Sequence, residues 1–332
     1  MTRSPARPEV RWQDALVGEL RSLGPWIEDR FLPTPGEASA PARTFHDGDY
    51  LADVIARMRA PRSASIEPPR RGSEFEFTVG ASRLARCYSS SVTAVAMAGL
   101  ANGVGLDVSA QRCTLTPRTV GQFTVGQFTV SFDLADDEIV RCAERPTSWA
   151  VAGPTVETVA ELREFVWSKL YGAHLAPLFE RTLEIGHVSA ALLWTSGAEC
   201  AGNISNFAEE YLGADAARPY VADRIALFGA ATLPGVPGPN PLRGTLEWIP
   251  VDGYDFPKQV QTRGMCCLSY LLEDRDGTLC QSCPYLPLAD RAALVHERHG
   301  VPMGAPGGQA TRRAQEIGRQ RPSFSRNLMA RS

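Results

Sequence analysis

The segment around which this chain is organised is rich in cysteine and reads RGMCCLSYLLEDRDGTLCQSCP over residues 263–284. It contains an adjacent pair, Cys266-Cys267, and after twelve further residues a second pair, Cys280-x2-Cys283, which Pro284 closes. Thiolates are soft ligands, and four of them in one place select zinc, copper(I) or an iron–sulfur cluster. The segment therefore predicts a metal centre if the chain brings the two pairs together.

The residues between the two pairs predict how they meet. Residues 268–272 have the composition of a short strand, and Asp276-Gly277 is a strong signal for a hairpin turn. A hairpin would fold Cys280 back toward Cys267, so that the four thiols converge. We therefore predict a small C-terminal cysteine hairpin.

The adjacent pair bears on the choice of metal. A structural zinc site usually takes its ligands from Cys-x2-4-Cys on both sides, because the turn lets both sulfurs reach one small ion. No residue separates Cys266 from Cys267, so the backbone must bulge for both to face one centre, and Gly264 supplies some of that freedom. A [2Fe–2S] cluster is a longer target than one ion. Zinc, and a plain hairpin with inert thiols, are the alternatives.

The order Cys-Cys, spacer, Cys-x2-Cys-Pro near the C-terminus resembles the FhuF-type ferric-siderophore reductases, which are [2Fe–2S] proteins of the bacterial cytoplasm. The twelve-residue spacer is slightly longer than that of the family. Extra residues at the hairpin tip need not change which thiols face one another. A looser likeness is the run YGAHLAPL at residues 171–178, where the family has a similar His-Leu-x-Pro-Leu run.

The resemblance implies a cofactor and a function. The cofactor would be a [2Fe–2S] cluster, and its ligands would be Cys266, Cys267, Cys280 and Cys283. The chain would be an oxidoreductase that passes one electron to a ferric siderophore, most simply a hydroxamate, and releases Fe(II) in the cytoplasm. Its electron donor would be of the ferredoxin or flavin reductase type. No catalytic residue beyond the cluster is expected, because the reaction needs neither a nucleophile nor a general base.

Two other functions compete with this one. Siderophore synthetases have a C-terminal region that resembles the family, but they need a large nucleotide-binding half, and the chain has no phosphate-cradling glycine motif. The other alternative is a binding or electron-carrier protein without reductase activity, held together by zinc or by an iron–sulfur centre. Colour separates the zinc-stabilised alternative from the reductase, because a [2Fe–2S] protein is reddish-brown and a zinc protein is colourless.

The composition is that of a globular protein. The chain has 332 residues and a formal net charge of −3, which argues against nucleic acid as the main partner. Eight cysteines are too few and too unevenly placed for a secreted disulfide framework. The N-terminus lacks a signal-peptide core, and the most apolar window, residues 92–106, is too short for a bilayer. We therefore expect a cytoplasmic protein without a transmembrane segment.

The pattern of apolar residues predicts an α+β fold, mostly helical, with an antiparallel sheet in the N-terminal half, drawn from residues near 74 to 152. Alternation predicts strands at residues 74–79 and 245–251. Helices are predicted near residues 10–23, 50–58, 82–100, 155–178, 187–212, 216–231 and 287–299. The proline-rich residues 233–244 predict a connector. The expected parts are a reductase-like domain (1–232), a [2Fe–2S] subdomain (245–300) and a flexible basic tail (301–332).

Other polar residues are weaker candidates for the site. His174 lies on the apolar face of its predicted helix and is interpreted as a core residue, with a role near the cluster as the alternative. His296 and His299 are close to the motif, but four cysteines already saturate a [2Fe–2S] core. A solvated role is the simpler interpretation of the flanking cations, which are Lys258, Arg263 and Arg275. The basic tail is a candidate for contact with an acidic electron donor or, peripherally, with a membrane surface.

Overall fold

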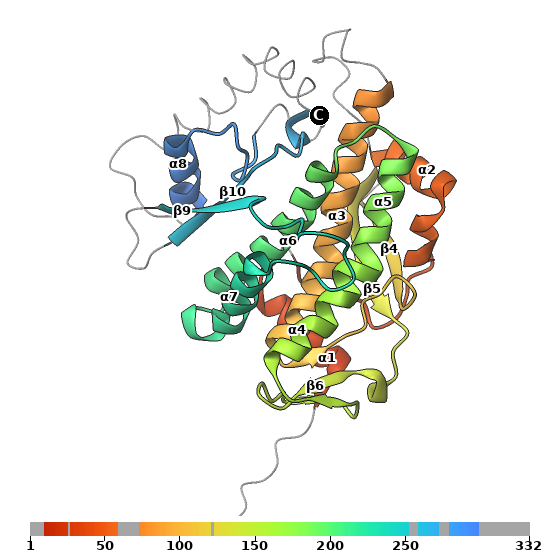
Figure 1. Ribbon diagram of the computed structural model, residues 1–332, viewed down its shortest axis with the longest axis vertical. Coiled ribbons are helices and arrows are strands. Elements are labelled where there is room, and N and C mark those ends of the chain that lie inside the picture. The colour runs from red at the N-terminus through yellow and green to blue at the C-terminus, as the bar shows by residue number, and fades with distance from the viewer. Residues whose placement is uncertain are drawn as a thin grey trace, which may run out of the picture. The chain divides into compact units, whose positions relative to one another are not determined.

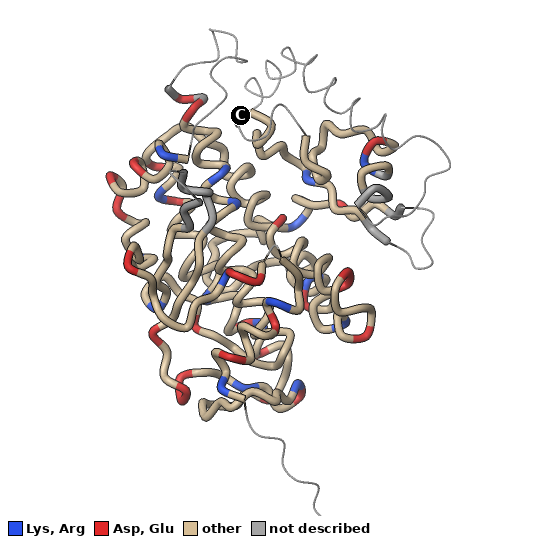
Figure 2. The backbone as a smooth tube through the Cα atoms, turned by 180° about the vertical axis from the view of Figure 1, so that it is seen from behind, with Lys and Arg blue, Asp and Glu red and all other residues tan. Residues whose placement is uncertain are grey.

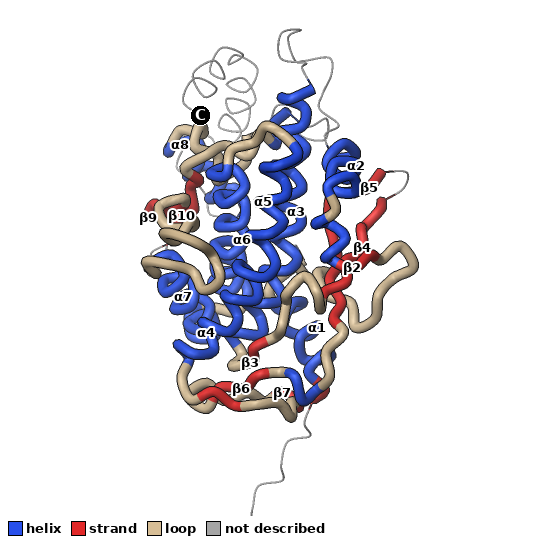
Figure 3. The backbone as a smooth tube through the Cα atoms, turned by 45° about the vertical axis from the view of Figure 1, so that its right-hand side comes forward, coloured by secondary structure: helices blue, strands red, loops and turns tan. Residues whose placement is uncertain are grey.

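The computed structural model describes residues 10–25, 27–58, 73–120, 123–251, 258–271 and 279–298, and the fold below concerns these residues. Helices form most of the structure, with short strands between them, so the α+β class is confirmed (Figure 3). The helices are α1 (Trp12–Ser22), α2 (Gly48–Met58), α3 (Ser73–Ala101), α4 (Val159–Trp167), α5 (Ala176–Ile185), α6 (Ala190–Tyr211), α7 (Ala214–Gly229) and α8 (Leu288–Arg298). The strands are β1 (Val10–Arg11), β2 (Ala40–Pro41), β3 (Val104–Gly105), β4 (Cys113–Val120), β5 (Phe123–Phe132), β6 (Val140–Cys142), β7 (Trp149–Ala150), β8 (Thr155–Val156), β9 (Leu246–Val251) and β10 (Lys258–Arg263).

The chain forms two compact units, each assembled from separated stretches. Unit 1 comprises Met1–Asp47, Cys87–Leu178 and Cys200–Asn240, and unit 2 comprises Gly48–Arg86, Phe179–Glu199 and Pro241–Ser332. The boundary between Asn240 and Pro241 falls inside the predicted proline-rich connector. The cysteine segment therefore shares its unit with two stretches that are distant from it in the sequence. The domain limits expected at residues 232, 245 and 300 stay a prediction.

The sheets of the N-terminal half belong to unit 1. In one, β4 pairs antiparallel with β5 and with β2, as Figure 3 shows. In the other, β3 pairs antiparallel with β6, but β6 pairs parallel with β8, and β1 and β7 form a separate parallel pair. The antiparallel prediction is thus correct for the larger hairpin and incomplete for the smaller pairings.

The strand predicted at residues 74–79 is wrong, because these residues form the beginning of α3. Glu74 and Glu76 lie in its first turn, where carboxylates favour the positive end of the helix dipole. The hydroxyl of Thr78 donates to the carbonyl of Glu74 one turn earlier, at 3.0 Å, and to that of His187, at 2.7 Å. Six alternating residues are too short a pattern to outweigh these helical contacts.

The long helical region after residue 155 changes its winding once. It begins with a capping box, in which the Thr158 hydroxyl accepts from the Glu161 N–H and the Glu161 carboxylate accepts from the Thr158 N–H. A π-helical segment, Ser168–Leu175, follows α4 and gives way to α5 at Ala176. Pro177 lies in the first turn of α5, where its missing N–H is tolerated. The winding therefore changes from π to α just before this proline.

Unit 1 has an aromatic core that encloses His174. The ring of Tyr88 meets those of Phe45, Phe128 and His174 edge to face, at centroid distances of 5.1, 5.8 and 5.3 Å. His174 is fully buried, with Nε2 2.6 Å from the Tyr88 hydroxyl and Nδ1 in contact with the carbonyl of Val108. Burial lowers the pKa of His174 to about 4. The interpretation of this histidine as a core residue is confirmed.

Unit 2 contains α2, α8 and the hairpin of β9 and β10, and Figure 1 shows α8 beside this hairpin. Its other described stretches are residues 73–86 and 179–199, which are linked where Thr78 meets the carbonyl of His187. The Phe179 ring packs edge to face on Trp194, at 5.0 Å. Figure 2 shows acidic and basic residues interspersed along the described chain. In the stretches that the structure describes, no helix is long and apolar enough to cross a membrane.

The buried His174 gives a prediction about acid stability. Its folded pKa of about 4 lies below the ordinary 6.5, so as the pH falls through this interval the unfolded chain takes up a proton first and stability is lost. The maximal loss is roughly 3 kcal/mol. His174→Gln does not titrate, so we expect its deficit in the free energy of unfolding, measured by urea denaturation, to shrink as the pH is lowered. Parallel pH profiles for the two proteins would contradict this.

Candidate metal centre

The end of strand β10 holds the two cysteine pairs of unit 2 together. β10 pairs antiparallel with β9, in register from Lys258↔Val251 to Arg263↔Leu246. At its last residue the backbone N–H of Arg263 donates to the carbonyl of Ser282, at 2.9 Å. The next residue, Gly264, donates to the carbonyl of Thr245, at 2.8 Å. The start of the cysteine segment is therefore tied both to the hairpin and to the second cysteine pair.

The first pair, Cys266-Cys267, is followed by a tight turn. The strand predicted at residues 268–272 is wrong, because Ser269–Leu271 form a 3-10 turn. Leu268 has a φ of 59°, in the left-handed region that residues with a Cβ rarely adopt. Its N–H points back to the Cys266 sulfur, at 3.4 Å, and the Ser269 hydroxyl lies 2.9 Å from the Cys267 sulfur. The reversal replaces the bulge that adjacent ligands require.

The second pair, Cys280 and Cys283, lies in two consecutive turns. The N–H of Cys283 donates to the carbonyl of Cys280, at 2.9 Å, and that of Leu286 to the carbonyl of Cys283, at 3.1 Å. From α8, Nη2 of the buried Arg291 donates to the carbonyls of Cys283 and Leu286, at 2.8 and 2.9 Å. Helix α8 thus fixes the second pair. The predicted hairpin tip, Asp276-Gly277, lies outside the described residues.

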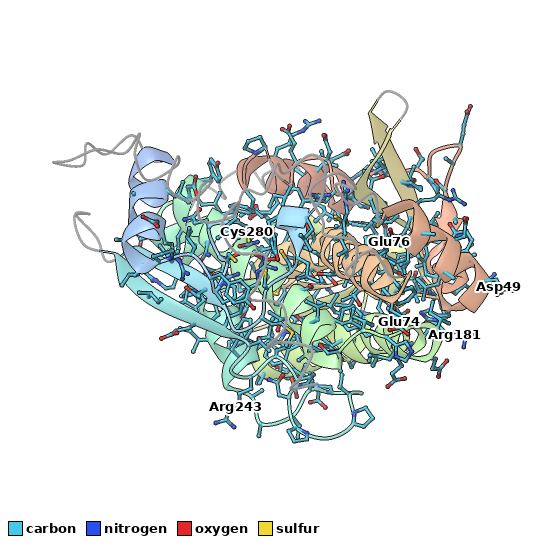
Figure 4. All side chains as sticks on the ribbon, turned by 90° about the horizontal axis from the view of Figure 1, so that it is seen from above. Asp49, Glu74, Glu76, Arg181, Arg243 and Cys280 are labelled. Carbon is cyan, nitrogen blue, oxygen red and sulfur yellow. The ribbon has the colours of Figure 1, made fainter. Side chains whose placement is uncertain are left out.

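The structure brings the four predicted cysteines together. The sulfurs of Cys266 and Cys283 are 3.9 Å apart, and those of Cys267 and Cys280 each lie 3.0 Å from one nitrogen, Nη2 of Arg263. Each thiol interacts with two of the others, so the four form a closed ring. Cys280, labelled in Figure 4, is partly exposed, and the other three are buried.

The sequence-based interpretation of Arg263 as a solvated side chain is wrong. Arg263 is 1% exposed, and its Nη1 lies 3.2 Å from Oε2 of Glu199 on helix α6. Its Nε donates to the Ser282 hydroxyl, at 3.2 Å, and that hydroxyl donates to Oε1 of Glu199, at 2.6 Å. A guanidinium, a carboxylate and a hydroxyl therefore form one network beside the thiols. Sequence reasoning missed Glu199, whose one signal is a carboxylate among the small residues 197–202.

The charges of this network act on the thiols. Burial by itself lowers the pKa of Arg263, but Glu199 and the adjacent cysteines outweigh it and raise that pKa well above its usual value. Hydrogen bonds from the thiols of Cys266 and Cys280 lower the pKa of Cys283 to about 4 and also lower that of Cys267. The donating thiols have raised pKa values for the same reason. The two thiols with lowered pKa values, Cys267 and Cys283, therefore lie on opposite corners of the ring, between the two with raised values.

An apolar shell surrounds part of the ring. Cys266 and Cys283 pack with the buried side chains of Leu279 and Leu286. Partly buried residues complete this cluster, namely Leu268, Tyr270, Cys280, Tyr285 and Leu294. On the other side of the ring the hydroxyl of Ser82, from the first half of α3, donates to the carbonyl of Cys267, at 2.8 Å. One side of the site is therefore dry, whereas the side of Arg263 is polar.

The four cysteines and the groups that hydrogen-bond to them are chemically suited to an iron–sulfur cluster. Four soft sulfurs meet a buried cation and backbone N–H groups, which are the partners that tune iron–sulfur centres. Among the described residues, no group of three or more His, Cys, Asp or Glu side chains is arranged to hold a metal ion. The fit therefore rests on the identity and pairing of the donors.

The remaining candidates do not join this ring. Cys87, Cys113, Cys142 and Cys200 all belong to unit 1, where the Cys113 thiol donates to the carbonyl of Val108, at 3.4 Å. The predicted helix near residues 287–299 is present as α8, and its Leu288 is 54% exposed. The remaining sequence candidates, with side chains outside those the structure describes, are Lys258, Arg275, His296, His299 and the basic tail.

Comparison of the chain with models of protein families and with curated proteins gives no match.

The left-handed Leu268 gives a prediction about the backbone. Replacement by glycine or by alanine removes the same packing, but alanine keeps the strain that a Cβ causes at a φ of 59°. We expect Leu268→Gly to exceed Leu268→Ala by about 0.5–1 kcal/mol in the free energy of unfolding, after allowing for the freer unfolded glycine chain. Chemical denaturation measures this. Leu183, inside helix α5, is the control site, where the alanine variant should be more stable than the glycine variant. If the alanine variant were the more stable one at Leu268 as well, the backbone strain at Leu268 would be contradicted.

Proposed function

We propose that this protein is a cytoplasmic ferric-siderophore reductase that holds a [2Fe–2S] cluster on Cys266, Cys267, Cys280 and Cys283. The observation that carries the proposal is the ring of four thiols beside a buried guanidinium. The cysteine spacing and its resemblance to the FhuF-type reductases support the same function. A cytoplasmic location would keep the thiols reduced and available to a metal centre.

The proposed substrate is chemically suited to a one-electron reaction. A siderophore binds Fe(III) through hard hydroxamate, catecholate or carboxylate oxygens, and Fe(II) is softer and less charged, so these ligands hold it more weakly. One electron from a donor of the ferredoxin or flavin reductase type converts the bound Fe(III) to Fe(II), which then leaves. When bound, the cluster would supply the one-electron redox centre that this exchange needs.

The residues of the chain would set the conditions for that exchange. Arg263 brings a positive charge to the sulfurs, which offsets the negative charge of a reduced centre. The apolar side chains around Cys266 and Cys283 exclude water from one side. Cys280 is partly exposed, so a bulky complex can approach this side of the ring without entering a deep pocket.

The ligand assignment predicts the effect of single cysteine substitutions. Serine at Cys266, Cys267, Cys280 or Cys283 should reduce or alter the visible absorption of protein purified without air, because each removes one sulfur ligand. Serine at Cys87, Cys113, Cys142 or Cys200, in unit 1, is the matched control and should leave the spectrum unchanged. Loss of colour from a control variant that keeps its circular dichroism would contradict the assignment, and zinc in place of iron and sulfide would favour the binding-protein alternative.

The reductase proposal is tested anaerobically. Protein is reduced with dithionite, freed of excess reductant and mixed with a ferric hydroxamate and a ferrous chelator, while both colours are followed. We expect the protein to reoxidise as an equal amount of Fe(II) is captured, because each centre holds one electron. A protein that stays reduced beside ferric hydroxamate, catecholate and citrate complexes alike would be an electron carrier, and the proposal would be wrong.

A further inference from the structure

The four thiols divide into two pairs with different hydrogen-bond partners. We propose, on the premise of the function above, that Cys266 and Cys283 ligate one iron and that Cys267 and Cys280 ligate the other. Arg263 is then the positioning residue that makes the iron of Cys267 and Cys280 the one that accepts the electron. Neither the pairing nor this polarity follows from the spacing of the cysteines.

The first pair is defined by distance and by backbone donors. Two sulfurs bound to one tetrahedral ion at about 2.3 Å lie about 3.8 Å apart, and those of Cys266 and Cys283 are separated by 3.9 Å. Each accepts a hydrogen bond from the backbone N–H two residues later, from Leu268 and from Tyr285. The two cysteines therefore have the same kind of backbone donor, and their sulfurs face each other.

The second pair is defined by a shared donor. A single nitrogen, Nη2 of Arg263, lies 3.0 Å from the sulfurs of both Cys267 and Cys280, and these two thiols also interact with each other. Hydroxyl groups also approach this pair, with Ser269 2.9 Å from Cys267 and Ser282 3.9 Å from Cys280. The adjacent residues Cys266 and Cys267 also interact with each other, but their other donors differ, and the proposed pairing rests on this difference and on the distance between Cys266 and Cys283.

The polarity follows from the donors. Hydrogen bonds from a charged group are about twice as strong as those from neutral amides. The sulfurs of Cys267 and Cys280 accept hydrogen bonds from the Arg263 guanidinium. Those of Cys266 and Cys283 accept hydrogen bonds from backbone N–H groups. Glu199 contacts the other end of the guanidinium, Nη1, so Nη2 remains directed at the sulfurs. When bound, the cluster would take up one electron, and the added negative charge would be stabilised most beside the cation. This pair also contains the partly exposed Cys280, from which the electron can pass to the substrate.

Mössbauer spectroscopy of the ⁵⁷Fe-loaded, dithionite-reduced protein tests the proposal, because it resolves the ferrous and ferric sites. Serine at Cys267 or Cys280 should alter the ferrous site, and serine at Cys266 or Cys283 the ferric site. If Cys266→Ser and Cys267→Ser altered the same iron site, the proposed pairing would be wrong. If serine at Cys267 or Cys280 altered the ferric site, and serine at Cys266 or Cys283 the ferrous site, the pairing would stand but the proposed polarity would be wrong.

Two further measurements test the proposal even if the serine variants fail to bind iron. In wild-type protein, paramagnetic NMR separates cysteine β-protons on ferrous and ferric iron by their opposite temperature dependence, and those on ferrous iron should show contacts to Ser269 and Ser282. Arg263→Gln should lower the midpoint potential more than Arg263→Lys, which keeps the charge. Arg163→Gln is the matched control, since this arginine pairs with Asp223 in unit 1, and should leave the potential unchanged. Equal potentials in wild type and Arg263→Gln would contradict the role of Arg263.

The two proposals fail in different ways. Wild-type protein that contains no iron and sulfide would overturn both the proposed function and the pairing. A cluster that shows the expected pairs but does not reduce ferric siderophores would overturn the reductase proposal and leave the pairing standing.

Discussion

The burial of the Arg263 guanidinium is the constraint on which the site depends. A cation with 1% of its surface exposed needs anionic partners, because the desolvation of an unpaired charge is costly. It has Glu199 at one end and the sulfurs of Cys267 and Cys280 at the other. Meeting this requirement brings together helix α6, the end of β10 and both cysteine pairs. The partners of this buried cation therefore include the thiols themselves.

The arrangement gives the ring a polar side and an apolar side. Neutral amides bond to Cys266 and Cys283 and the charged Arg263 to Cys267 and Cys280, while leucine side chains pack against all of these cysteines except Cys267. In the proposed cluster this asymmetric field would make the two halves different, and the half beside the cation would best stabilise an added electron. This is also the half that contains the partly exposed Cys280. The asymmetry links the packing of the site to the proposed transfer of an electron to a bulky acceptor.

Sequence patterns predicted well where local preference and packing agree. Long runs with three-to-four spacing became helices, and His174, on an apolar face, is buried between Tyr88 and Val108. Patterns failed where they were short. Residues 74–79 alternate as a strand does, but their carboxylates and Thr78 favour the first turns of α3. Residues 268–272 have strand composition, but three of them form a 3-10 turn after the left-handed Leu268.

The sequence by itself determined the identity of the candidate donors, since it supplies four soft sulfurs in two close pairs before any fold is known. It also determined the α+β class. Only the tertiary structure decided that Arg263 is buried, that Glu199 is its partner and that the thiols divide into two pairs. The physical reason is that these contacts join residues from separate elements. Their energy depends on burial and on distance in space, neither of which is encoded in local residue spacing.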